Sequence, residues 1–323
     1  MTTHFRKITA VVLMLIASTT AFAQQDAQYS MYMFNGMAIN PAYAGSRERP
    51  AITALYRHQW AGIAGAPKTF SLAGHAPLLN DRIGLGGSIA SDNIGVLNLI
   101  SFSGSFAYRI KFNNNTKLSV GMSAVFNNFR QRFSEITTTN ENDPNFARNI
   151  SVFSPNFGAG VYYYGERFYV GVSIPHLLNA SINESGKFEG TDQVARQYRH
   201  YFATAGYVIN AGEHLKIKPS VMYKYVNNTP SSLEPSLGFL IKEALWLGAS
   251  YRMGFGKAGG GFGSDAVIGM VEYVFQKNFR IGYAYDFTVS QLNNYTSGSH
   301  EIMLGYEFGK KETYLTPRRM SYF

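Results

Sequence analysis

Hydrophobic and polar side chains alternate along most of this chain with a period of two. The stretch FRIGYAYDFTV (279–289) puts every second residue, from Phe279 to Phe287, on an aromatic or aliphatic face, and Arg280 and Asp286 on the opposite face. A period of two is typical of a β-strand with two unlike faces. The aromatic face would be buried in a soluble sandwich, but it would face lipid in a membrane barrel.

The alternation recurs in fourteen segments after residue 50, each of which predicts a strand. They cover residues 51–60, 68–78, 82–91, 99–112, 116–133, 154–164, 167–178, 197–210, 215–226, 233–241, 245–253, 266–276, 279–289 and 299–309. Segments of about ten residues are long enough for a tilted strand to cross a bilayer.

The connections between these segments alternate in length. Connections after even-numbered segments are tiny, such as 113–115, whereas those after odd-numbered segments are mostly longer and polar. The longer ones are 134–153, 179–196, 254–265 and 290–298. This sorting is typical of outer-membrane barrels, whose short turns lie in the periplasm and whose long loops lie outside. The sequence therefore predicts an all-β fold, a 14-stranded antiparallel transmembrane β-barrel, with the aromatic face of 279–289 toward lipid.

The first 23 residues have the composition of a secretory signal peptide. Arg6 and Lys7 precede a short apolar run, and Ala21-Phe22-Ala23 forms an A-x-A cleavage site. We therefore expect the mature chain to begin at Gln24 and to reach the bacterial outer membrane.

These features divide the chain into four parts. We expect a signal peptide at 1–23, an N-terminal periplasmic or lumen-filling segment at 24–50, the barrel at 51–309 and a basic C-terminal tail at 310–323. The second part is rich in Met, Tyr, Phe and Asn and is too irregular to form a strand.

Composition narrows the function classes. The net charge is +9, of which Arg6 and Lys7 contribute +2, and no more than two Lys or Arg stand in a row. Export and the absence of a basic cluster argue against a nucleic-acid partner. Charged residues make up only 15% of the chain, below the ~25% of ordinary soluble domains. With no cysteine, the chain has neither a disulfide framework nor the attachment site of a lipoprotein.

Motifs for catalysis or cofactor binding are weak. Residues 254–259 match G-x-G-x-x-G, but no helix is expected after them, so a flexible glycine loop is the simpler interpretation. The acidic stretch 140–143 lacks the ligand spacing of a calcium loop. The histidines lack metal-ligand spacing, and no nucleophile motif is present. We expect no cofactor, no metal and no enzymatic activity, and an outer-membrane enzyme is the weakest alternative.

Six charged residues fall on the predicted inner faces of the last four strands. They are Arg252, Glu272, Arg280, Asp286, Glu301 and Glu307. A catalytic or ion-selective constellation is one interpretation. An internal ladder of cross-strand ion pairs is the favoured one, because no Ser, Cys or His stands at a matching position.

Residues 28–78 carry motifs that resemble the PorP/SprF family of outer-membrane proteins. These are NPAYAG (40–45), YRHQW (56–60) and GAPKT (65–69), followed later by HYF (200–202) and YDF (285–287). The resemblance implies a non-enzymatic barrel of type IX secretion that assists secretion or surface attachment of cargo with C-terminal sorting domains. The implied partners are that cargo, outer-membrane lipid and other secretion components, including periplasmic lipoproteins or peptidoglycan-binding proteins. The role would be of an adhesin or gliding type, or part of the core machinery.

The family motifs supply candidate partner contacts. These are Asn40, Pro41, Tyr43, Gly45, Gln59, Trp60 and Pro67. The alternative is structural: Pro41 fixes φ and Gly45 lets the chain turn into the first strand. The alternative function is a passive porin, with a basic lumen lined by Lys216, Lys218 and Lys224.

Overall fold

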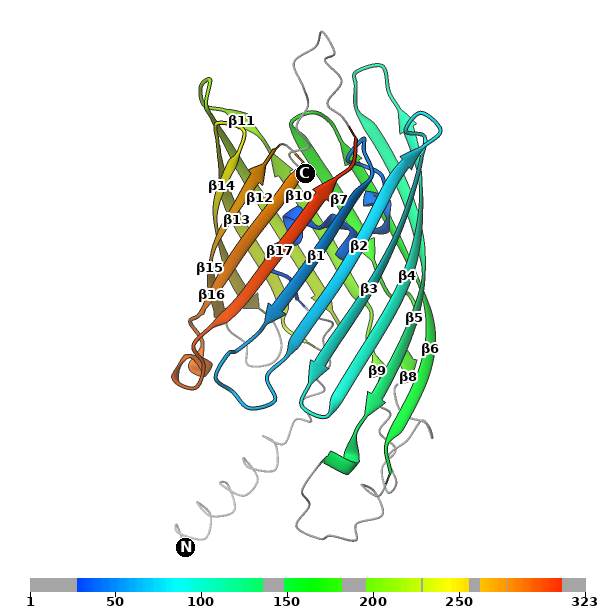
Figure 1. Ribbon diagram of the computed structural model, residues 1–323, viewed down its shortest axis with the longest axis vertical. Helices are drawn as coiled ribbons and strands as arrows, with labels where there is room; N and C mark the ends of the chain where they lie inside the picture. Colours follow the sequence, from blue (N-terminus) through cyan, green and yellow to red (C-terminus); the bar gives the residue numbers. More distant parts are fainter. Residues whose placement is uncertain are drawn as a thin grey trace, which may run out of the picture.

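A computed structural model describes residues 28–135, 148–181, 196–227, 229–255, 262–276 and 278–309. Its wall is a closed antiparallel barrel of fourteen strands, and pairing of the first strand with the last closes the sheet (Figure 1). The wall consists of β1 (Ala51–His58), β2 (Lys68–Leu78), β3 (Ile83–Ile94), β4 (Leu97–Lys111), β5 (Lys117–Gln131), β6 (Ile150–Tyr164), β7 (Phe168–Ile174), β10 (His200–Tyr207) with β11 (Ile209–Asn210), β12 (Leu215–Val226), β13 (Ser231–Ile241), β14 (Leu245–Phe255), β15 (Phe262–Phe275), β16 (Phe279–Thr288) and β17 (Ser299–Glu307). The predicted fold is confirmed. The expected signal peptide and the C-terminal tail lie outside the described residues.

Several strands differ from the predicted bounds by up to four residues, as at the start of β6 and of β15 and the end of β7, and one predicted strand is interrupted. The segment predicted at 197–210 is divided at Val208 into β10 and β11, and the N–H of Val208 donates to the carbonyl of Arg167 at 2.6 Å, in the register of the β10–β7 pairing. Residues 196–197 form β9 (Arg196–Gln197), which pairs with β8 (Ala180–Ser181) in a small separate sheet. The predicted start of this strand at 197 was therefore wrong, and the wall resumes at His200.

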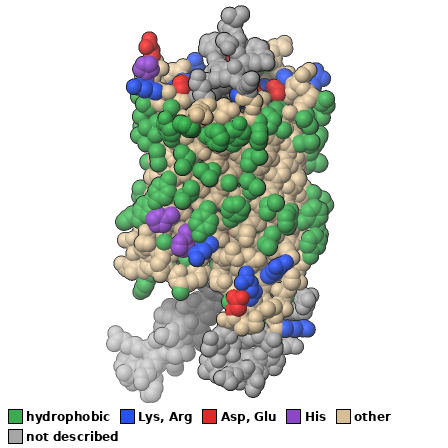
Figure 2. Space-filling model, in the orientation of Figure 1, with side chains coloured by type: hydrophobic (Ala, Val, Ile, Leu, Met, Phe, Trp, Pro, Cys, Tyr) green, Lys and Arg blue, Asp and Glu red, His purple; other side chains and the backbone are tan. Residues whose placement is uncertain are grey.

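The outer surface of the wall is apolar. Along β16 exposed and buried residues alternate, with Phe279, Ile281 and Phe287 about half exposed and Arg280 and Asp286 buried. On the face seen in Figure 2, hydrophobic side chains are spread over the wall, and Lys, Arg, Asp and Glu side chains gather near its two ends. A wall with aromatic and aliphatic residues outward and polar residues inward suits a lipid environment. No helix among the described residues is long and apolar enough to cross a membrane.

The two ends of the barrel carry different connections. Turns such as 79–82, 112–116 and 242–244 join strands at one end, here called the short-turn end, where Phe308 donates its N–H to Pro50. At the opposite, long-loop end, β5 is linked to β6 by residues 132–149 and β16 to β17 by residues 289–298.

Most of residues 28–50, here called the lumen segment, lies inside the barrel, and the segment ends with the exposed Glu48 and Pro50 (Figure 1). The segment contains three short 3-10 helices: η1 (Tyr32–Phe34), η2 (Gly36–Ala38) and η3 (Pro41–Tyr43). It runs from Ser30, which contacts the long-loop halves of β16 and β17, to Arg47, which contacts Glu307 near the short-turn end. Its apolar side chains, including Met31, Tyr32 and Tyr43, pack against inward-facing wall residues in three buried clusters.

Impermeant thiol labelling tests the expected orientation of the barrel in the membrane. Because the chain has no cysteine, Tyr295→Cys in the 289–298 loop and Asn114→Cys in a short turn each carry a unique label site. We expect intact cells to label position 295 at once and position 114 only after the outer membrane is disrupted. The opposite order would reverse the topology.

Candidate functional site

The motif at residues 40–45 forms a capped turn inside the barrel. The Oδ1 atom of Asn40 accepts the N–H of Ala42 at 2.9 Å, which caps η3, and Pro41 occupies the first helical position, where no N–H is needed. The Nδ2 atom of Asn40 donates to the carbonyl of Val161 on β6 at 3.1 Å. Gly45 has a left-handed φ of +69° and donates its N–H to Nδ1 of His75 at 3.0 Å.

The barrel wall hydrogen-bonds the backbone of the lumen segment directly. Ser119 donates to the carbonyl of Ala42 and Ser173 to that of Ile39, both at 2.7 Å. Arg109 donates to the carbonyl of Ala44 at 2.7 Å. A buried irregular segment needs such partners because its backbone groups are shielded from water. The wall thus supplies donors for backbone carbonyls of the segment, those of Ile39, Ala42 and Ala44.

The seven candidate contact residues do not form one site. Asn40, Pro41, Tyr43 and Gly45 are buried in the lumen. The other three lie at the long-loop end, where Gln59 donates its N–H to the carbonyl of Pro67 at 2.9 Å and Trp60 donates its N–H to Oγ of Ser299 at 3.1 Å. A partner could reach the four buried residues only if the lumen segment moved.

The predicted inner charges separate into two clusters. The long-loop cluster consists of Ser30, Arg57, Glu234, Arg252, Asp286 and Glu301, and the short-turn cluster consists of Arg47, Glu272, Arg280 and Glu307. Each cluster therefore includes at least one residue of the lumen segment. The charges do not simply link neighbouring strands, as the ladder interpretation expected, but also join the wall to the segment.

In the long-loop cluster, two carboxylates hold Ser30. The Glu301 carboxylate accepts the backbone N–H groups of Ser30 and Met31 at 2.9 and 2.7 Å. The hydroxyl of Ser30 donates to the carboxylate of Asp286 at 2.7 Å. Charge-assisted bonds of this kind are stronger than bonds between neutral groups.

Two arginines contact these carboxylates and a third, Glu234. Arg57 contacts Asp286 at 2.8 Å and Glu301 at 3.0 Å. Arg252 contacts Glu234 at 2.7 Å and Asp286 at 3.0 Å. All five charged side chains are almost fully buried. Because removal of charges from water is costly, the cluster is stable only while its members remain together.

In the short-turn cluster, Arg47 joins the segment to the wall. Its Nη1 contacts Glu307 at 2.7 Å, its Nε donates to the hydroxyl of Tyr43 at 2.9 Å, and its Nη2 donates to the carbonyl of Phe34 at 3.1 Å. Burial disfavours the charged guanidinium, but Tyr43 and Glu307 outweigh burial and raise the pKa of Arg47 above its ordinary value. Arg280 adds contacts to Glu272 at 3.7 Å and to Glu307 at 3.9 Å.

The lysines proposed to line a basic channel are occupied by other contacts. The Lys218 ammonium lies 5.4 to 5.8 Å from the ring centres of Phe34, Tyr169 and Trp246, and its side chain is buried. Lys224 donates to Oε1 of Gln28 at 3.3 Å, and Lys216 forms an ion pair with Glu243. Aromatic faces attract cations, so Lys218 belongs to the packing of the lumen rather than to a wet surface.

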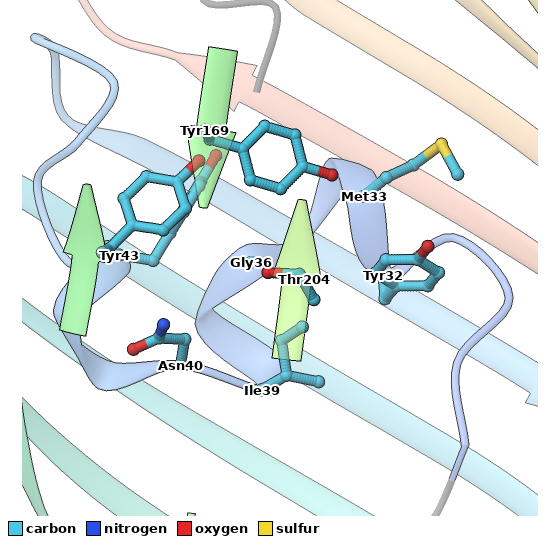
Figure 3. A pocket seen from close by; sticks show the side chains of 9 residues that line it. Tyr32, Met33, Gly36, Ile39, Asn40, Tyr43, Tyr169 and Thr204 are labelled. Carbon is cyan, nitrogen blue, oxygen red and sulfur yellow. The ribbon is translucent and has the colours of Figure 1, made fainter. Parts of the chain in front are cut away.

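One small cavity lies between the lumen segment and β6, β7 and β10. Its lining includes Tyr32, Asn40, Tyr43, Tyr169 and Thr204 (Figure 3). Its volume of about 30 Å³ admits water but not an organic ligand. No group of three His, Cys, Asp or Glu side chains among the described residues could hold a metal. The 140–143 stretch and most of the 254–259 glycine motif lie outside that part of the chain.

Four residues of the clusters were missed in the sequence. Arg57 on β1 and Glu234 on β13 occupy inward-facing positions in the alternation of buried and exposed residues. The same alternation, followed along every strand, would have identified both residues from the sequence. Ser30 and Arg47 lie in an irregular segment without a period. Only their contacts with the wall reveal them.

Comparison with known proteins agrees with this architecture. The family model described as type IX secretion system membrane protein PorP/SprF matches residues 21–306. Among solved structures, the CymD monoaromatic hydrocarbon channel is similar at 11% identity and a TM-score of 0.52, over 90% of this chain and 96% of that one. A Pseudomonas aeruginosa FadL homologue gives 12% identity and a TM-score of 0.47, over 90% of this chain and 96% of that one. The Acinetobacter baumannii outer membrane protein Omp33 gives 12% identity and a TM-score of 0.46, over 80% of this chain and 98% of that one. No curated protein matches. At such identities the CymD similarity shows the fold alone, that of an outer-membrane β-barrel.

Proposed function

This chain belongs to the PorP/SprF family of type IX secretion system membrane proteins, and from that membership we propose that it assists the secretion or cell-surface attachment of protein cargo. The cargo would be recognised through its C-terminal sorting domain. The proposal assigns the protein no reaction of its own. Its contribution is to hold a secreted chain, or a component of the secretion machinery, at the outer membrane.

The filled lumen is the observation that favours a docking role over a transport role. Met31, Tyr32 and Ala42 are at most 2% exposed, and two buried charge clusters join the lumen segment to the wall. The space that a porin keeps open for solutes is occupied by protein here. Contact with a partner is therefore expected on the ends and edges of the barrel rather than within it.

The passive porin is the competing function. It rested on a basic lumen, but Lys218 packs on aromatic rings and Lys216 is paired with Glu243. A channel function would require the lumen segment to leave the barrel. The two functions differ in conductance, because a filled barrel passes no steady current and an open porin does.

Two partner classes fit a docking role. A dedicated cargo receptor would retain one large secreted protein, whereas a core component would retain periplasmic lipoproteins or peptidoglycan-binding proteins. We expect the long-loop end to serve the first class and the short-turn end the second, given the orientation expected for the barrel.

Affinity purification from gently solubilised outer membrane tests the proposal. Proteins recovered with the tagged barrel are identified by mass spectrometry, and an unrelated tagged outer-membrane barrel is the control. Recovery of a secreted protein through its C-terminal domain, or of periplasmic secretion components, is the expected result. A barrel recovered with neither class would contradict the proposal.

A further inference from the structure

Strand β6 is paired along only part of one edge. Toward β5 its ladder is continuous, from Ile150 opposite Gln131 to Tyr164 opposite Lys117. Toward β7 the ladder covers only 159–164, because β7 ends at Ile174. Among the described residues, no strand pairs with the β7-facing edge of 150–158. In Figure 1, β5 and β6 extend further toward the long-loop end than β1 and β2.

The chain that leaves β7 closes only the part of this gap nearest to β7. Leu177 donates its N–H to the carbonyl of Phe157 at 2.7 Å. The side chain of Asn156 accepts the N–H of Leu178 and donates to its carbonyl, both at 2.9 Å. The following strand β8 comes close to β6, but it forms its ladder with β9. Among the described residues, the hydrogen bonds along this edge therefore stop at Asn156, and β8 approaches β6 without a backbone hydrogen bond to it.

The remaining edge presents a regular row of backbone groups. Because the carbonyl of Phe157 points toward the β7 side, a period of two directs the backbone groups of residues 151, 153 and 155 the same way. Residue 155 is Pro, which lacks an N–H and is tolerated in strands mainly on unpaired edges. Ser151 and Phe153 thus offer both donor and acceptor groups, and Pro155 offers an acceptor.

The side chains around this edge are apolar and basic. Phe153 is 65% exposed and stacks on Phe126, with ring centres 6.0 Å apart. Arg130 lies opposite Ser151 in the ladder, and Arg148 immediately precedes the strand. Arg199 borders the gap from the other side, with its backbone N–H bound to Asn179. All three arginines are exposed.

We propose that residues 151–155 of β6 are a docking edge to which an extended segment of the secreted cargo adds as a further strand. Main-chain hydrogen bonds would provide affinity. Apolar side chains of the segment would pack on Phe153, and acidic ones would meet the three arginines, which gives charge complementarity. A long unpaired edge is otherwise a liability that native sheets cover or blunt. This inference rests on the proposed cargo-binding function and specifies its site.

Substitution of Phe153 by Pro tests the edge. Phe153→Pro removes one edge N–H, keeps the pairing with β5 and repeats a residue type already present at 155. Phe153→Val is the matched control, because it removes the ring but keeps the N–H. We expect Phe153→Pro to lower the cargo recovered per barrel at least tenfold and Phe153→Val to lower it less than threefold. Equal recovery with Phe153→Pro and wild type would overturn the inference.

Folding of Phe153→Pro is checked by the heat-dependent shift in gel mobility that a folded barrel shows. A second variant tests the edge if Phe153→Pro does not fold. Arg148→Glu is exposed and leaves the strand intact. It should lower cargo recovery at least threefold, and unchanged recovery would count against the charge complementarity. Ser151→Cys, coupled to a benzophenone maleimide, should form a photo-cross-link to the same cargo. A cross-link within the chain, to residues 182–195, would show that its own loop occupies the edge and would overturn the proposal.

These outcomes distinguish failure of the proposed function from failure of the docking edge. If the wild-type barrel recovers no cargo, the proposed function fails before the edge is tested. If the wild type recovers cargo and neither Phe153→Pro nor Arg148→Glu changes the amount, the function stands and the docking edge is wrong.

Discussion

Replacing Gly121 by alanine is expected to destabilise the folded barrel by about 2–3 kcal/mol, the usual cost of overpacking a tight core. A Cβ atom at residue 121 on β5 would lie 2.4 Å from both the N and Cα atoms of Ala42. Those atoms are backbone, so the whole turn at 40–45 would have to shift. Tyr43 and Asn40, which anchor that turn, would lose their fit against the wall.

The matched control for Gly121→Ala is Gly104→Ala on the neighbouring strand β4. A Cβ atom at residue 104 would meet no heavy atom within 4 Å. We expect this variant to be as stable as wild type or slightly more stable, because alanine restricts the unfolded chain. Urea unfolding in detergent micelles, followed by tryptophan fluorescence, measures both variants. Equal stability of the two would mean that the lumen segment does not pack on β5 as described.

Removal of the Arg57 guanidinium is expected to cost about 3–5 kcal/mol of folding free energy, since it breaks a buried charge pair and leaves its partners uncompensated. In Arg57→Ala, the buried Asp286 and Glu301 would both lose their contact with this cation. The same carboxylates hold Ser30 and Met31, so the start of the lumen segment should loosen as well. Unfolding midpoints and proteolysis of the segment report the two effects.

Two comparisons make the Arg57 result specific. Glu135→Ala breaks an exposed pair with Arg132 and should change stability by less than about 1 kcal/mol. Arg57→Lys should lose less stability than Arg57→Ala, because it keeps a cation beside the buried Asp286 and Glu301, although without the planar fork of the guanidinium. If Arg57→Ala were as stable as wild type, the long-loop cluster would not hold the segment.

The strands were predictable from sequence because their pattern is local. The segment 215–226 was expected and found as β12, since alternation and flanking turns specify a strand without distant contacts. The β8–β9 pair was not predictable, because two-residue strands are too short to show a period. Its position depends on a tertiary contact, the hydrogen bond from Asn127 to Gln197 at 3.1 Å.

The charge clusters were predictable only in part. The alternation along the last four strands placed Arg252, Asp286 and Glu301 on the inner face, and they meet there in one buried cluster. The same alternation also places Arg57 of β1 and Glu234 of β13 on the inner face. Ser30 and Arg47 could not be found in this way, because the wall rather than any repeat positions the lumen segment.

Planar-bilayer recording of the purified wild-type protein tests the central claim most directly, that the chain's own N-terminal segment fills the barrel and that its function is docking. An open porin inserted under the same conditions is the positive control, and folding is verified by heat-dependent gel mobility. The account predicts that folded protein inserts and stays silent, with no stepwise current. Steady, ohmic steps from the wild-type chain would contradict the account and would favour the porin.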